Sequence, residues 1–489
     1  MMRTSWTVAA GAMICVACTA GLPPRPKPVQ LADAVPLQGF ATAGGGEWPA
    51  EHWWQRYRDP TLDRLIELAT DSSPTLATAH ARYDSARQSV RLAGAASGVR
   101  MDASADIDRQ RLSDNGLVPP TLLGFHWYNQ ADLGLQASYT FDWWGKQRAA
   151  VEAAMDQAHA AQADRSAAAL LLASSVADTY FGWQADQSRL SLARARADAV
   201  LREGAIAAAR VKAELDSADE LDRYALAAAD AQEQVAMLQG SATLRLIALA
   251  ALAGKPLAEL PPLQAKALPT VPDNLPDDVR IDLISRRADI TASRWRVEAA
   301  QKDLDAARAE FFPDITINAL AGLSSIDLGK LLNYGSRIPQ ASAALHLPIF
   351  DSGRLEARYG ASQASVDAAV ASYRDTLVSA ARDVATQAST RAQIAAQRSQ
   401  RLIEVDAAQR LQTSASARVR QGIIDSRTEL TATEALLQQR DALLQLDAAA
   451  VAADIALQRA LGGGYLSAQK LAASASPSTK ASPSPTAIP

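Results

Sequence analysis

Side chains that commonly carry catalysis or bind metal ions are scattered along this chain of 489 residues. None of the five histidines lies at a metal-ligand spacing from another one. They are His52, His80, His126, His159 and His346. The sequence contains no Gly-x-Ser-x-Gly nucleophile motif and no Gly-rich phosphate-binding loop. We therefore predict a protein without catalysis, cofactor or resident metal, and we interpret the acidic residues of its helical stretches as solvated faces.

The two cysteines lie near the amino terminus, in a segment that predicts export and lipid attachment. Arg3 supplies a positive charge, and residues 6–17 form an apolar stretch that is too short to span a bilayer as a helix. This stretch ends in the sequence C-V-A-C at residues 15–18, which is similar to a bacterial lipobox. We predict an export signal over residues 1–17 and a lipid on Cys18. The alternative is an ordinary signal with a free thiol. Cleavage before Cys18 leaves one cysteine, so no intrachain disulfide is expected.

Two similar joints, in which an alternating stretch passes into a long helical stretch, organise the rest of the chain. Over residues 133–141 apolar side chains alternate with small or polar ones, which predicts a strand with one apolar face. After Gly145 an alanine-rich run without proline follows, and this run predicts a helix. The same joint recurs over residues 345–354. With further alternating stretches at residues 99–107 and 315–323, the sequence predicts four amphipathic strands in a twofold internal repeat.

The long helices are predicted from two proline-free tracts, residues 121–255 and 349–476. Proline in a helix interior costs roughly 3 kcal/mol, so long tracts without it indicate helices. Turns near residues 216–219 and 422–426 divide each tract into two arms, and the returning arms have apolar residues at steps of three, four and seven. This pattern predicts coiled-coil hairpins whose arms are on the order of 100 Å long.

The predicted domain organisation follows from these elements and from the positions of proline and glycine. An export signal covers residues 1–17, a lipidated Pro/Gly-rich tether 18–50, a first repeat 51–255, a Pro-rich linker 256–280, a second repeat 281–464 and a disordered tail 465–489. The net charge of −4 gives no reason to expect a basic surface, so nucleic acid is not an expected partner.

The four predicted strands lack a globular core that could cover their apolar faces, which indicates a membrane environment. An open sheet edge is not tolerated inside a membrane, and single-chain membrane barrels have at least about eight strands. Four strands per chain therefore imply an oligomer. Three chains would give about twelve strands and an open lumen, whereas an eight-stranded barrel is packed with side chains, so we expect a trimer. A sheet packed on the helices is the alternative. The residues expected to face lipid are Leu133, Leu135, Tyr139, Phe141, Ile315, Ile317, Leu345 and Leu347.

Short motifs along the whole chain resemble those of the TolC-type outer-membrane factors, particularly the lipoprotein branch that serves resistance-nodulation-division efflux pumps. The motifs are Trp53-Trp54 with Asp59-Pro60 and Leu62, Arg286-Arg287-Ala288-Asp289-Ile290, Phe311-Phe312-Pro313, Leu347-Pro348-Ile349-Phe350-Asp351-Ser352-Gly353-Arg354-Leu355 and Ala460-Leu461-Gly462-Gly463-Gly464. Ala288 stands where the family normally has proline. The resemblance implies a trimeric β-barrel in the outer membrane, continued across the periplasm by an α-helical barrel. A periplasmic adaptor and an inner-membrane pump would dock below it.

The function that this resemblance implies is that of a passive conduit in tripartite efflux, which exports small molecules such as drugs. A type I secretion duct is one alternative, although the lipobox and the Arg-Arg-x-Asp-Ile segment favour efflux. A pore-less periplasmic coiled-coil adaptor or scaffold is an alternative from a different class. The four alternating strands distinguish the two classes, because an adaptor would not place strands just before each long helix.

The G-I-I-D turn that ends at Asp425 resembles the tip of the family, in which an acidic residue rings the constriction of the periplasmic gate. The resemblance therefore assigns that role to Asp425. Three carboxylates on one axis repel one another unless a cation or an arginine compensates them, and Arg418 and Arg420 are candidate partners. Asp216 and Asp219 occupy the equivalent turn of the first repeat. The alternative for these aspartates is helix capping in a solvated turn.

Overall fold

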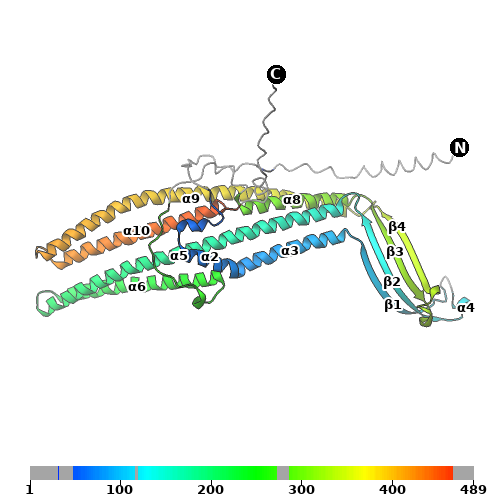
Figure 1. Cartoon of the computed structure of the whole chain (residues 1–489), viewed down its shortest axis with the longest axis horizontal. Helices are drawn as coiled ribbons and strands as arrows, with labels where there is room; N and C mark the ends of the chain where they lie inside the picture. The colour runs from blue at the N-terminus through cyan, green and yellow to red at the C-terminus, as the bar shows by residue number, and fades with distance from the viewer. Residues whose placement is uncertain (1–30, 32–47, 116–118, 272–285, 466–489) are drawn as a thin grey trace, which may run out of the picture. The chain divides into compact units, whose positions relative to one another are not determined.

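The computed structural model describes residues 31, 48–115, 119–271 and 286–465. Within these ranges the chain is mainly helical and has one antiparallel sheet (Figure 1). Several predictions fall outside the described residues: the export signal, Cys18, most of the tether, the end of the linker, the start of the second repeat and the tail from residue 466.

The order of elements is nearly the same in the two halves of the chain: a helix, two strands and a helical hairpin. The first half contains η1 (Trp53–Tyr57), α2 (Pro60–Ser72), α3 (Pro74–Ala96), β1 (Arg100–Arg111), α4 (Pro120–Leu123), β2 (Trp127–Phe141), α5 (Lys146–Lys212), α6 (Ala218–Ala253) and η2 (Leu257–Glu259). The second half contains α8 (Ala288–Ala309), β3 (Asp314–Ser325), η3 (Leu328–Lys330), η4 (Tyr334–Ser336), β4 (Arg337–His346), α9 (Arg354–Arg420) and α10 (Ser426–Ala460). The predicted internal repeat is therefore present in the order of elements.

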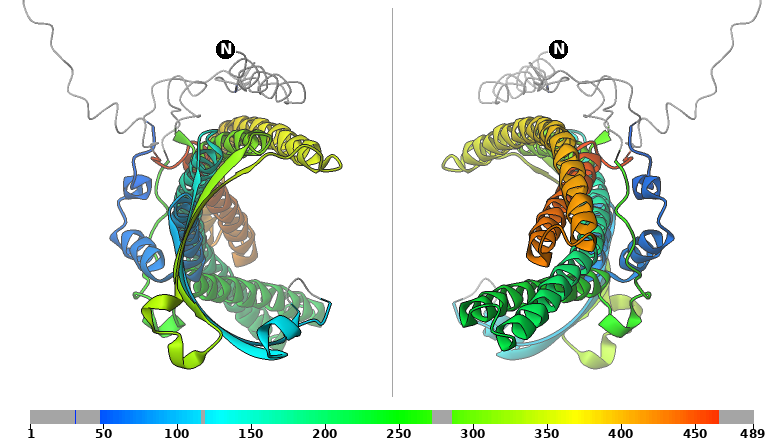
Figure 2. Two further views of the ribbon diagram at one scale, coloured as in Figure 1. Left: turned by 90° about the vertical axis from the view of Figure 1, so that its right-hand side faces the viewer. Right: turned by 90° about the vertical axis from the view of Figure 1, so that its left-hand side faces the viewer.

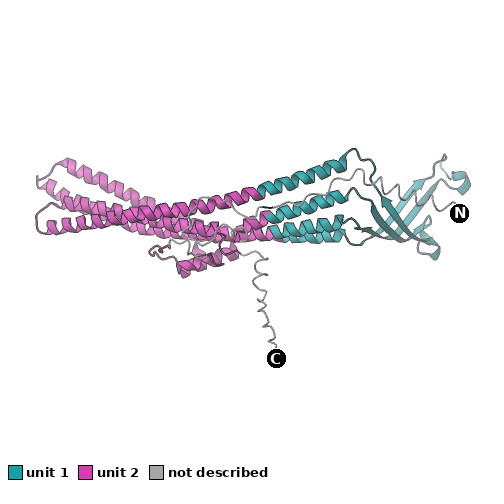
Figure 3. Cartoon of the chain, turned by 90° about the horizontal axis from the view of Figure 1, so that it is seen from above, with its two compact units in different colours: residues 1–31, 84–160, 294–372 teal, residues 32–83, 161–293, 373–489 magenta. Residues whose placement is uncertain are grey.

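The chain divides into two compact units, and each unit takes segments from both halves of the sequence (Figure 3). Unit 1 comprises Met1–Leu31, Asp84–Ala160 and Arg294–Ser372, which include the sheet and the starts of α5 and α9. Unit 2 comprises Ala32–Tyr83, Ala161–Ser293 and Tyr373–Pro489, which include both hairpin turns.

The sheet of unit 1 has the strand order β1-β2-β3-β4, and all neighbouring strands are antiparallel (Figure 1). Figure 2 shows that the sheet is curved. The four predicted strands are thus confirmed. The fourth strand ends earlier than predicted, at His346, because Pro348 has no N–H group for a ladder bond. Leu347 was predicted to face lipid as a strand residue, and this prediction is corrected: Leu347 lies after the end of β4.

Each joint between a strand and a long helix is capped by an aspartate that follows a phenylalanine. The side chain of Asp142 accepts hydrogen bonds from two backbone N–H groups at the start of α5, at 3.0 and 2.8 Å. Asp351 accepts two backbone hydrogen bonds before and within α9, at 3.1 and 2.9 Å. Gly145 and Gly353 make the sharp turns, with φ angles of 77° and 86° that favour glycine. The aspartates therefore satisfy N–H groups that have no partner within the helix.

The end of α8 is fixed to the starts of both long helices within unit 1. The carboxylate of Glu310 lies 3.4 Å from the ammonium group of Lys146 in α5 and 3.3 Å from the guanidinium group of Arg358 in α9. The ring of Trp144 stacks on that of Phe312, with centroids 4.4 Å apart. These contacts bring the two joints of the repeat together.

The two hairpins of unit 2 are built alike. Both α5 and α9 are 67 residues long, and each ends in a turn with a backbone hydrogen bond of 2.9 Å from an N–H group to the carbonyl five residues earlier. This bond is typical of a Schellman motif, which needs a left-handed residue. That residue is Glu214 in the first turn and Gly422 in the second, with φ angles of 59° and 70°. The helix α5 therefore ends at Lys212, slightly before the turn predicted near residues 216–219.

One described helix, α6, has the length and apolar composition to cross a membrane. Core helices of other proteins have the same length and composition, and the contacts of α6 in unit 2 are those of a packed helix. Its Leu238 packs on Leu190 of α5, and its Ser241 and Arg245 each donate a hydrogen bond of 2.7 Å to Asp186 of α5. These contacts assign α6 to the coiled-coil hairpin that the sequence predicts.

Carboxylates of α10 are paired with arginines of both neighbouring long helices in unit 2. The pairs are Arg189–Asp441, Arg196–Glu434, Arg391–Asp454 and Arg398–Asp447, at 2.7, 3.2, 3.6 and 2.6 Å. Along each helix these residues are seven positions apart, as expected for antiparallel coiled coils. Arg391 and Asp454 are both buried, and Asp454 also accepts a hydrogen bond of 2.7 Å from the hydroxyl of Tyr57. The segment before α2 is thereby tied to the helices.

The glycines that follow α10 lie where three other segments of unit 2 meet. Gly462, Gly463 and Gly464 have φ angles of 94°, 55° and 82°. A Cβ atom on them would lie 1.8 Å from Arg286, 2.1 Å from Leu170 and 2.2 Å from Ala50, respectively. At Gly462 and Gly464 the close neighbour is backbone, which leaves no room for a side chain, whereas at Gly463 it is the side chain of Leu170.

We expect Gly462→Ala to destabilise the protein by about 2–4 kcal/mol, because alanine there combines a left-handed backbone with a clash against a carbonyl oxygen. The measurement is the midpoint of thermal unfolding, followed by tryptophan fluorescence. Gly240→Ala in α6 is the control, because no atom lies within 4 Å of its Cβ position and alanine favours a helix. Equal midpoints for the two variants would contradict the expected close packing.

Candidate functional site: the sheet faces and the hairpin turns

The two faces of the sheet in unit 1 differ in polarity, because side chains alternate along each strand. The register places seven of the residues predicted to face lipid on one face. They are Leu133, Leu135, Tyr139, Phe141, Ile315, Ile317 and Leu345. Ala103, Ala105, Ala321 and Ala341 continue this face across β1, β3 and β4. We call it the apolar face, and its contact with lipid remains a prediction.

The opposite face of the sheet is mostly polar. It includes Asp102, Asp106, Gln136, Ser138, Thr316, Asn318 and Ser342. The hydroxyls of Thr140 and Thr316 form a hydrogen bond of 3.0 Å between β2 and β3. Leu320 and Ile338 are large apolar residues on this face. A polar inner face and an apolar outer face are typical of membrane barrels with a water-filled interior.

Aromatic side chains border the apolar face at both ends of β2. Near the joint, the ring centroids of Tyr139 and Phe141 are 5.0 Å apart, and that of Trp143 lies 5.9 Å from Phe141. Trp127 begins the strand at its other end. In membrane barrels, girdles of aromatic residues flank the apolar band at both interfaces with water. The apolar face therefore has the composition of a membrane-spanning wall.

The edges of the sheet need further strands. Within the described residues, β1 and β4 each pair with one neighbour only. Unpaired N–H and C=O groups of an edge strand are too costly inside a bilayer. A sheet with this apolar face can span a membrane only as part of a closed barrel.

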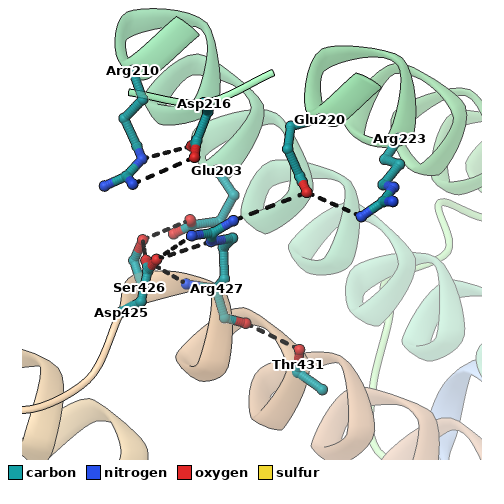
Figure 4. Close-up of polar contacts among 9 residues, drawn as sticks. All are labelled: Glu203, Arg210, Asp216, Glu220, Arg223, Asp425, Ser426, Arg427 and Thr431. Atoms are coloured by element: carbon teal, nitrogen blue, oxygen red, sulfur yellow. Dashed lines mark hydrogen bonds and ion pairs between the residues drawn. The ribbon is translucent and has the colours of Figure 1, made fainter. Parts of the chain in front are cut away.

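The second candidate site is the pair of hairpin turns in unit 2 (Figure 4). Asp425 is the N-cap of α10, and its side chain accepts a hydrogen bond of 3.2 Å from the backbone N–H of Arg427. The guanidinium group of Arg427 lies 2.7 Å from the same carboxylate and 4.0 Å from Glu220 of α6. The hydroxyl of Ser426 donates a hydrogen bond of 2.9 Å to Glu203 of α5. The start of α10 is therefore bound to both arms of the first hairpin.

The first turn contains a similar pair. The guanidinium group of Arg210 donates a hydrogen bond of 2.6 Å to Asp216. This hydrogen bond lowers the pKa of Asp216, and the hydrogen bond from Arg427 lowers the pKa of Asp425. Both carboxylates are therefore ionised at neutral pH, as an acidic ring requires.

The partners of Asp425 differ from those chosen from the sequence. Arg418 and Arg420 are exposed side chains in the last turn of α9, and neither forms an ion pair with a described residue. Asp219 lies in the first turn of α6 and likewise has no described ion pair. Sequence reasoning missed Arg427, although an arginine two positions after an N-cap aspartate can fold back onto it. The capping role left open for Asp425 is observed, and it coexists with the ion pair.

Within the described ranges, no group of three or more His, Cys, Asp or Glu side chains is arranged to hold a metal ion. The chemistry that the two sites can support is recognition of lipid on the apolar face and electrostatic control at the turns.

Comparison with known proteins identifies relatives over most of the chain. The outer membrane efflux protein family matches residues 65–255 and 280–463. The multidrug resistance outer membrane protein MdtP of Escherichia coli K12 is 32% identical over 451 residues, which are 90% of this chain and 91% of MdtP. MdtQ of Escherichia coli O157:H7, another multidrug resistance outer membrane protein, is 33% identical over 442 residues, which are 87% of this chain and 90% of MdtQ.

Solved structures of outer membrane channels have the same fold. The outer membrane protein VceC of Vibrio cholerae superposes with a TM-score of 0.76 at 32% identity, covering 85% of this chain and all of VceC. The outer membrane channel CmeC of Campylobacter jejuni has a TM-score of 0.82 at 20% identity, covering 93% and 97% of the two chains. The likeness to CmeC concerns the fold alone.

Proposed function

Because this chain belongs to the outer membrane efflux protein family, we propose that it is the outer-membrane channel component of a tripartite efflux system. The register of the sheet is the observation that carries the proposal. Four strands share one apolar face, leave two edges unpaired and pass directly into helices of 67 residues. The sheet lies in the outer membrane, and the hairpins extend into the periplasm.

The proposed assembly is a homotrimer. Three copies of the four-stranded sheet give about twelve strands, enough for a barrel with an open lumen. Pairing β4 of one copy with β1 of the next satisfies every edge, and the polar face then lines the lumen. The hairpins of the three copies continue this barrel as a helical one.

The proposed cargo is small molecules such as drugs, because MdtP and MdtQ are named multidrug resistance proteins. The protein serves as a passive conduit and needs no catalytic residue. Energy for transport comes from an inner-membrane pump, which is connected through a periplasmic adaptor that docks on the helical part.

Two alternatives from the sequence are less well supported. A type I secretion duct has the same architecture, but the names of MdtP and MdtQ favour drug efflux. A pore-less periplasmic adaptor or scaffold would have no use for a sheet with an apolar outer face. Detection of the protein in the periplasmic fraction without membrane would support that second alternative.

The proposed periplasmic gate lies at the hairpin turns, where Asp425 of three copies converges on the axis. Repulsion among the three carboxylates raises the energy of the closed state, and Arg427 offsets part of it within each chain. The exposed groups of Arg418 and Arg420 are candidate partners for a neighbouring copy. Asp216 and Asp219 add negative charge from the first turn.

We expect Leu135→Arg to reduce the amount of heat-stable trimer in membranes, because an arginine near the bilayer midplane costs about 2–4 kcal/mol. Gln136→Arg is the matched control, since the next residue of the same strand lies on the polar face. The trimer is quantified by gel electrophoresis of unheated membranes. Equal amounts of trimer for the two variants would mean that the apolar face does not face lipid.

We expect Asp425→Asn to change the single-channel current in planar bilayers and to weaken block by divalent cations from the periplasmic side. Asparagine removes the charge but is also a favourable N-cap, so the variant separates the two roles of this residue. Asp222→Ala, an exposed carboxylate of α6 farther from the turn, is the control and should leave both properties unchanged. If only Asp425→Ala has an effect, and Asp425→Asn has none, the residue acts as a cap and the constriction lies elsewhere.

We expect a Cys18→Ala form with a standard export signal to reach the outer membrane and to conduct. The apolar faces of three chains hold the trimer in the bilayer, so one acyl group per chain anchors it but does not drive transport. Conductance and outer-membrane fractionation are measured against the native protein. A native protein whose Cys18 is unmodified by mass spectrometry would refute the lipidation itself.

A further inference from the structure

The apolar face carries arginines at the end that is distant from the helix joints. Arg337 begins β4 and pairs in register with Leu323 of the apolar face. Arg109 of β1 lies on the same face, two residues beyond Ile107. Both guanidinium groups therefore stand on the side of the sheet that the proposed function places against lipid.

Beside Arg337 the apolar face is hollowed. The open hollow has a volume of about 500 Å³ and is lined by Ala103, Leu133, Gly134, Leu135, Ala321, Gly322, Leu323, Arg337 and Pro339. It forms because the alanines of β1 and β3 stand beside the longer leucines of β2. Its lining is hydrocarbon except for the arginine, which suits an acyl chain next to a charged group.

The two arginines rest on aromatic rings and lack a carboxylate partner. The guanidinium carbon of Arg337 lies 4.0 Å from the ring centroid of Tyr334, and that of Arg109 lies 5.6 Å from that of Trp127. Neither forms an ion pair with a described residue. Arg111, by contrast, is paired with Asp114 at 3.2 Å. A guanidinium group at the border of an apolar band lies at the depth of the lipid head groups, and it is free to pair with an anionic one there.

We propose that Arg337 and the adjoining hollow bind a phosphorylated glycolipid of the outer leaflet, with its phosphate on the guanidinium group and an acyl chain in the hollow. The planar fork of arginine matches phosphate oxygens, and Tyr334 holds it in place. The inference rests on the proposed function: the joints lead into periplasmic helices, so the opposite end of the strands lies at the outer leaflet. In an outer membrane, that leaflet presents the phosphates of lipopolysaccharide. Arg109 of the neighbouring copy, whose β1 pairs with β4 in the proposed trimer, supplies a second phosphate contact.

The test uses the full-length trimer in detergent and two probes, bisphosphorylated lipid A and the same lipid after removal of its phosphates. Binding is measured by native mass spectrometry. We expect the phosphorylated probe to bind the native trimer at least about tenfold more tightly, as a charged hydrogen bond in a partly apolar site implies. Arg337→Gln should abolish this preference, and Arg337→Lys should keep part of it. Arg100→Gln, on the polar face of β1, is the control and should keep all of it.

Equal binding of the two probes by the native trimer, or an unchanged preference in Arg337→Gln, would overturn the proposal. The same preparations are tested for conductance and for heat-stable trimer. A native protein that neither assembles nor conducts refutes the proposed function, whereas normal conductance without phosphate preference refutes the lipid site alone. If Arg337→Gln does not assemble, Arg337→Lys and Arg109→Gln decide: a preference unchanged in both contradicts the site.

Discussion

The unpaired edges of β1 and β4 are the constraint on which the rest of the structure depends. A bilayer offers no hydrogen bonds to an exposed backbone, so a four-stranded sheet cannot remain alone in it. The internal repeat gives each chain four strands, two from each half, and only assembly of several chains closes the barrel. Once the barrel is closed, the polar face lines its lumen and forms the wall of the conduit. Assembly, membrane insertion and the conduit therefore all depend on pairing the free N–H and C=O groups of the edge strands β1 and β4.

The second requirement is a direct passage from strand to helix, and the joints show how the sequence meets it. A strand that leaves the membrane must release its ladder bonds just as the helix acquires its first unpaired N–H groups. Asp142 and Asp351 provide the acceptors at this point, and glycines supply the turn. Glu310 ties the two joints together through Lys146 and Arg358. The barrel wall and the helical part are thus linked by short polar contacts.

Periodicity was sufficient to predict the strands, the long helices and the apolar face, because each depends on the order of neighbouring residues. Details that depend on backbone geometry or on distant contacts could not be predicted in this way. The alternation continues through Leu347, yet the strand ends at His346. The pairing of Asp425 with Arg427 depends on how the first turn of α10 folds back. Ala288 stands where the family normally has proline, and it is the first residue of α8. Proline is common at the first position of a helix, and alanine is also compatible with that position, so the helix starts there without the proline.

The contacts between α5 and α10 differ between the middle of the hairpins and the turns, where we propose the gate. Arg189 and Arg196 hold carboxylates of α10 at intervals of seven residues, and the first pair is bidentate. At the next interval the pattern changes: Glu203 receives a hydrogen bond from the hydroxyl of Ser426. A single hydroxyl contact constrains two helices less than a bidentate arginine pair does. The bidentate pair has two parallel hydrogen bonds, which fix the relative orientation of the two side chains, whereas a hydroxyl makes one. Toward the turns, the side-chain contacts between α5 and α10 therefore change from arginine–carboxylate pairs to a single hydroxyl contact, and this is the region of the proposed gate.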